Sequence, residues 1–101
     1  MPLFVSGIVS VEGYHAGAIR TLLYLARNEQ TPYNTTVADT VQAISNLRAS
    51  LGGGEDQGIV VEGSNPEEAI IVPSDDNGLT FARTPDQVRP HALEILLFSC
   101  R

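Results

Sequence analysis

The chain has 101 residues, of which 43% are apolar and 18% are charged. This length suits one domain with a modest core, and the apolar fraction is too high for a fully disordered protein. Twelve acidic residues and six arginines give a net charge of -6. Because a negative protein repels phosphate backbones and anionic lipids, we expect neither nucleic acid nor a membrane as a partner. The single cysteine, Cys100, cannot form a disulfide within the chain and leaves the redox compartment open.

The first nine residues are largely apolar, and no basic residue accompanies them. Glu12 and His15 interrupt the apolar run well before the roughly 20 residues that a membrane span needs. We therefore predict neither a signal peptide nor a transmembrane segment here, and the sequence leaves the localisation unknown. An apolar helix at the start of a chain needs a covering surface from elsewhere, so we expect this start to be a truncation.

Residues 3–27 repeat their apolar side chains at helical spacing, which predicts one long helix. The members of its apolar stripe are Ile8, Ile19, Leu22, Leu23 and Ala26. Gly13 and Gly17 lie four residues apart on a neighbouring face, and each costs the helix up to about 1 kcal/mol relative to alanine. We expect another helix to approach this glycine face closely.

A second, amphipathic helix is predicted over residues 36–51, after a polar connection that contains Pro32. Thr36 is a suitable N-cap, and Asp39 three residues later suits a capping box and the helix dipole. The apolar stripe of this helix consists of Val37, Val41, Ile44, Leu47 and Leu51. Three consecutive glycines at residues 52–54 then end the helix.

Residues 52–83 are interpreted as a long loop that wraps the bundle, because two short β-branched runs are set among glycine, asparagine, proline and acidic residues. A terminal helix is predicted over residues 85–98, with Thr84 as its cap, Pro85 at its first position and Gln87 closing a capping box. Pro90 should kink or delay this helix. Together these elements predict an all-α fold with one long, one medium and one short helix.

Two short motifs are assigned to local structure. The run from Asp75 to Gly78 is similar to part of a calcium loop, but no glutamate stands six residues after Gly78, so we interpret the run as a turn. Asn34, Thr35 and Thr36 fit the glycosylation sequon, and capping by Thr36 is the role we expect there.

Glu12 and His15 fall on the apolar stripe of the first helix, between Ile8 and Ile19 at steps of four, three and four residues. An ionisable pair buried there is costly unless it is bonded, and two alternatives would satisfy it. The first is hydrogen bonding between the two side chains, or to Arg20 or a nearby tyrosine. The second is a metal site, since a carboxylate and an imidazole at this spacing can bind one ion, as in the Glu-x-x-His elements of ferritin-like di-iron bundles.

Residues 11–24 read Val-Glu-Gly-Tyr-His-Ala-Gly-Ala-Ile-Arg-Thr-Leu-Leu-Tyr, and they resemble the last core helix of the ferritin-like domain in the desiccation-related protein family. Residues 41–48, 56–59 and 71–88 resemble the C-terminal portion of that family in order and spacing. The resemblance implies a partial ferritin-like helical bundle, with three preceding helices that carry two glutamates and a second Glu-x-x-His. It also implies that Glu12 and His15 are metal ligands, for iron or manganese at an incomplete site. The tail departs from the family at residues 89–92, where His91 is interpreted as a solvated residue.

Three functions are compatible with these features. The first is a non-enzymatic, stress-associated ferritin-like fragment with an incomplete half-site at Glu12 and His15. The second is a di-metal carboxylate redox or iron-handling protein, for which even a symmetric dimer falls short of the four carboxylates and two histidines of the di-iron pattern. The third is a helical interaction module. Because two helices cannot surround their own apolar stripes, we expect self-association or binding to missing N-terminal helices.

Overall fold

The computed structural model describes residues 3–52 and 55–89 of the chain. Two long helices, α1 (Leu3–Leu25) and α2 (Val37–Gly52), account for most of its regular structure, and residues 85–89 form a short third helix. No strand occurs in the described ranges, and the predicted all-α class is confirmed. None of the described helices is both long enough and apolar enough to cross a membrane.

The observed helix bounds lie close to the predicted ones. α1 ends at Leu25 instead of near residue 27, and α2 begins at Val37, directly after its cap. The backbone N–H of Asp39 donates to Thr36 Oγ1 at 3.1 Å, which confirms Thr36 as the N-cap. Residues 85–89 of the predicted terminal helix are helical. Its remainder, together with His91 and Cys100, lies outside the described residues.

Hydrogen bonds confirm two further local predictions. The short helix begins with a capping box, in which the Thr84 N–H donates to Gln87 Oε1 at 2.8 Å and the Gln87 N–H donates to Thr84 Oγ1 at 3.3 Å. The run that begins at Asp75 is a turn, because Asp75 Oδ1 accepts the backbone N–H groups of Asn77 and Leu79, both at 2.9 Å.

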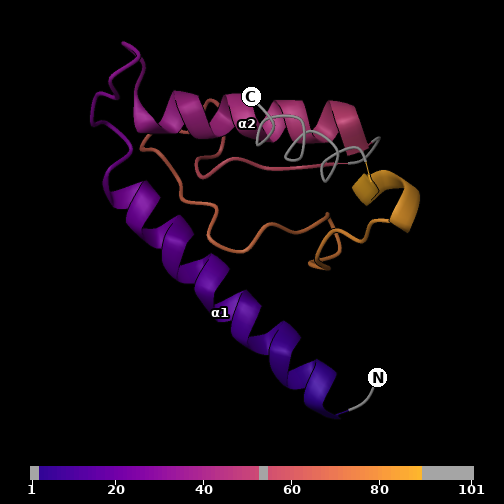
Figure 1. Ribbon diagram of the computed structural model, residues 1–101. Coiled ribbons are helices and arrows are strands. Elements are labelled where there is room, and N and C mark those ends of the chain that lie inside the picture. Colours follow the sequence, from indigo (N-terminus) through magenta and orange to yellow (C-terminus); the bar gives the residue numbers. More distant parts are fainter. Residues whose placement is uncertain (1–2, 53–54, 90–101) are drawn as a thin grey trace.

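The connection between the helices reverses the chain tightly. The Thr31 N–H donates to the carbonyl oxygen of Thr35 at 2.8 Å, and Asn34 between them adopts a left-handed φ of 63°, a conformation that asparagine tolerates better than most residues. From this connection α1 and α2 diverge like the arms of a V, and the loop of residues 55–83 returns through the region between them (Figure 1).

The loop of residues 55–83 carries the small core of the described chain. Ile59 is only 1% exposed. Next to it, Val60 and Ala69 form an isolated antiparallel bridge, which the Ile70 N–H supports by donating to the Ile59 carbonyl oxygen at 2.8 Å. The two β-branched runs of the loop, residues 59–61 and 70–72, are therefore joined to each other by this hydrogen bond.

The apolar stripe of α1 is only partly covered. Leu23 and Ala26 are half-buried, whereas Ile8, Ile19 and Leu22 are all more than half exposed. Arg20 and Tyr24, on another face, are half-buried and bond to the loop. At 3.6 residues per turn the two faces differ by about a third of a turn. The expectation of a buried stripe is thus wrong for Ile8, Ile19 and Leu22, because the loop packs on the Arg20 face instead.

Gly13 and Gly17 lie on the same side of α1 as Arg20 and Tyr24, nearer the N-terminus of the helix. Nothing lies within 4 Å of the position that a Cβ atom would take at Gly13 or Gly17. The predicted close approach of another helix is therefore not made by α2, which diverges from this part of α1 (Figure 1).

Candidate functional site

Glu12 and His15 lie near the middle of α1, and both are exposed. They share the open face of the helix with Ile8 and Ile19, as the sequence predicts. Among residues 3–52 and 55–89, no three or more His, Cys, Asp or Glu side chains are grouped so that they could hold a metal ion. A metal bound by Glu12 and His15 would therefore need ligands beyond the described part of the chain.

Arg20, one of the partners considered for this pair, bonds to the loop instead. Its Nη1 atom donates to the carbonyl oxygens of Gly58 at 2.6 Å and Ile70 at 2.9 Å, and its Nη2 atom donates to that of Gln57 at 2.7 Å. One guanidinium thus holds both sides of the loop's small bridge against α1. Burial lowers the pKa of Arg20, and the nearby Asp56 carboxylate opposes this change.

Asp56 fixes the start of the loop to α2. Its side chain is 6% exposed, and its Oδ1 atom accepts the Ser45 hydroxyl at 3.0 Å and the Gln57 backbone N–H at 2.8 Å. The Oδ2 atom pairs with Arg83 at 3.1 Å and with Arg48 at 3.4 Å. Since Ser45 is itself a buried residue of α2, this carboxylate gives a buried hydroxyl the partner that burial requires.

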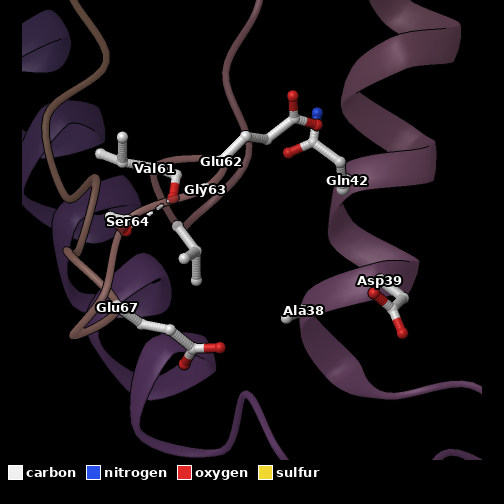
Figure 2. Close-up of a pocket in the computed structure, with 9 residues that line it drawn as sticks. Ala38, Asp39, Gln42, Val61, Glu62, Gly63, Ser64 and Glu67 are labelled. Atoms are coloured by element: carbon white, nitrogen blue, oxygen red, sulfur yellow. Dashed lines mark hydrogen bonds between the residues drawn. The ribbon is translucent and has the colours of Figure 1, made fainter.

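A hollow between α2 and the loop has a volume of about 220 Å³. Its labelled walls are drawn in Figure 2, where Ala38, Asp39 and Gln42 come from α2 and the facing side comes from the loop. Glu67, on the loop side, is paired with Arg27, which lies just after the end of α1. The other two carboxylates of the hollow, Asp39 and Glu62, are exposed. We assign no function to this hollow, because its acids do not form a group suited to a cation within the described residues.

Sequence reasoning missed Arg20 and Asp56. One signal could have indicated Arg20, since no acidic residue stands three or four positions away from it on its helix. An arginine on a half-covered helix face without such a neighbour needs a distant partner. Asp56 follows directly on the glycine-rich end of α2, and nothing in its local sequence indicates its four contacts.

The fold and these contacts define a helical protein in which a long loop is fixed to two diverging helices. The chain is 39% identical over 90 residues to the desiccation-related protein PCC13-62 of Craterostigma plantagineum. The match covers 82% of this chain and 29% of the relative, so the chain spans less than a third of the relative's length. It supports a relationship to desiccation-related proteins at the level of the family. No family model and no solved structure matches the chain.

Proposed function

We propose that this chain is a stress-associated, non-catalytic part of a ferritin-like helical bundle, in which Glu12 and His15 form one half of a metal site. The observation that carries the proposal is the open face of α1. On that face, exposed apolar side chains flank Glu12 and His15, a carboxylate and an imidazole of the types that bind metals. The loop of the same chain packs on another face, at Arg20.

The open face of α1 favours packing against further helices. Ile8, Ile19 and Leu22 are each more than half exposed on this face. Several large apolar side chains exposed on one helix face favour an interaction site. Helices of a four-helix bundle cover such stripes for one another. The related protein has more than three times the length of the matched region, so we propose that preceding helices supply the cover, and that isolated chains associate with each other instead.

The donor types at Glu12 and His15 suit iron or manganese, since carboxylate and imidazole ligands bind both metals. Two donors leave most of a coordination sphere to water, and the di-iron pattern of ferritin-like bundles adds further carboxylates from other helices. We therefore propose an incomplete site in this chain. A di-metal redox or iron-handling protein is the alternative, and it requires those additional ligands to meet Glu12 and His15 in the full assembly.

We expect the isolated chain to self-associate, and Leu22→Glu to weaken that association about tenfold or more, because a charge replaces an apolar side chain in the contact. Sedimentation velocity over a range of concentrations measures the effect. Val72→Glu is the matched control, since Val72 is 69% exposed on the loop and Leu22 is 66% exposed on α1. A wild-type chain that stays monomeric and unfolds cooperatively would contradict the proposed bundle face.

We expect weak binding of ferrous or manganous ions to the wild-type chain, and loss of most of the binding heat in Glu12→Ala and in His15→Ala, because each removes one of two donors. Isothermal titration calorimetry under anaerobic conditions measures this, with zinc as a third ion. Glu62→Ala, which removes an exposed carboxylate from the loop, serves as the control. Equal heats from all four proteins would rule out the half-site.

A further inference from the structure

A second hollow of about 290 Å³ lies where α1, α2 and the loop meet. Three arginines line it, Arg20 from α1, Arg48 from α2 and Arg83 from the loop, and Asp56 is the one acidic residue in its wall. We call this hollow the arginine pocket. Three positive charges and one negative charge leave it at +2, although the whole chain carries a net charge of -6.

The four charged groups do not satisfy one another. Asp56 forms ion pairs with both Arg48 and Arg83, so its single negative charge is shared between them. Arg48 contacts it only through Nε at 3.4 Å, and the Arg48 side chain is 50% exposed. The Nε atom of Arg83 is buried without a hydrogen-bond partner among the described residues. A guanidinium carries five N–H donors, so Arg48 and Arg83 both keep donors for another acceptor.

The charges around Arg20 also favour an anion in the pocket. The positive charge of Arg48 lowers the pKa of Arg20, in addition to the larger effect of burial, and Asp56 opposes both. Arg20 uses its Nη atoms on loop carbonyls, which are neutral acceptors. An anion in the pocket would therefore add to the attraction that Asp56 already supplies and would further offset the repulsion between Arg20 and Arg48.

The other walls limit the size and type of this anion. Pro73 and Phe81 form apolar parts of the wall, and Thr80 adds a hydroxyl group that can donate a hydrogen bond. The volume of about 290 Å³ is at the lower end for small-molecule pockets. It exceeds what a bare phosphate fills, and it leaves room for a small organic group beside Phe81. A dianion matches the local charge of +2 better than a single carboxylate does.

We propose that the arginine pocket binds a phosphate group, free or as the monoester of a small molecule, between the guanidiniums of Arg48 and Arg83. Planar guanidiniums match phosphate oxygens bidentately, and charge-assisted hydrogen bonds of this type are the strong ones. The site does not depend on the open face of α1 or on any metal. The phosphate site can therefore be tested independently of the proposed bundle function.

The test is calorimetric titration of the metal-free chain with inorganic phosphate and with glycerol phosphate, at constant ionic strength. We expect both to bind, and Arg48→Gln to weaken them about tenfold or more through loss of its charged hydrogen bonds. Tighter binding of the ester would indicate that the organic group contacts the apolar wall. Equal affinities would assign the recognition to the phosphate alone.

Arg89→Gln is the matched control, because Arg89 is 78% exposed, pairs with Asp86 and is not among the described residues that line the pocket. It removes the same charge, and we expect unchanged phosphate binding. Circular dichroism confirms that each variant is folded, and Thr80→Val provides a second pocket variant that leaves the three arginines in place. Absence of phosphate binding by the wild-type chain would overturn the proposal, as would equal weakening in Arg48→Gln and Arg89→Gln.

Discussion

Arg20→Ala is expected to destabilise the fold by roughly 3 kcal/mol, which is a large part of the about 5 to 15 kcal/mol that holds a typical domain. The guanidinium makes three hydrogen bonds to loop carbonyls, and one of these carbonyls belongs to the buried Gly58. Alanine would leave that acceptor without a partner and release both sides of the loop's bridge from α1. Urea unfolding followed by circular dichroism at fixed protein concentration measures the loss.

Two companion variants make the Arg20 prediction specific. Arg20→Lys keeps the charge, but a single ammonium group cannot reproduce the planar guanidinium that reaches three carbonyl oxygens. We therefore expect its free energy of unfolding to lie between those of the wild-type chain and Arg20→Ala. Arg89→Ala removes an exposed arginine and should change the free energy of unfolding by less than about 0.5 kcal/mol. If Arg20→Ala were as stable as Arg89→Ala, the guanidinium would not be the attachment of the loop to α1.

Asp56→Ala is expected to have the second large effect and to lower the free energy of unfolding by about 3 kcal/mol. Removing one member of a buried ion pair leaves the other charge without compensation. Arg83, whose side chain is 16% exposed, is the group left in that state. The half-exposed Arg48 can instead be solvated by water. Its loss of the ion pair should therefore add little to the destabilisation of the fold. The Ser45 hydroxyl would lose its acceptor as well.

A double-mutant cycle separates these contributions. Combining Asp56→Ala with Arg83→Ala should recover about 1 kcal/mol or more relative to the sum of the single changes, because the uncompensated charge is then gone. Additive losses in chemical denaturation would show that Asp56 acts through Ser45 and the Gln57 N–H and not through Arg83.

The helices could be predicted because their signals are local. Apolar spacing indicates α1, and Thr36 and Thr84 cap the following helices through residues three positions away. The position of Glu12 and His15 on one face follows from the same periodicity. These features need only neighbouring residues, so the sequence contains all the information that they require.

The covered face of α1 could not be predicted in this way. It depends on Arg20 meeting carbonyls that lie 37, 38 and 50 residues further along the chain, and no local pattern encodes such a contact. The exposure of Glu12 and His15 is a consequence, because a stripe read from periodicity shows which residues share a face but not which surface covers that face. The pairing of the two β-branched runs was missed for the same reason.

The attachment of α1 at Arg20 also distributes stability unevenly along one helix. The last turns of α1 are held by the loop, while Gly7 and Gly13 have no neighbour at the Cβ position and add little intrinsic helix propensity to the first turns. Local unfolding should therefore start at residue 3 and stop near Arg20. Docking against other helices would then also be a folding step for the first half of α1, so that assembly and the ordering of Glu12 and His15 occur together.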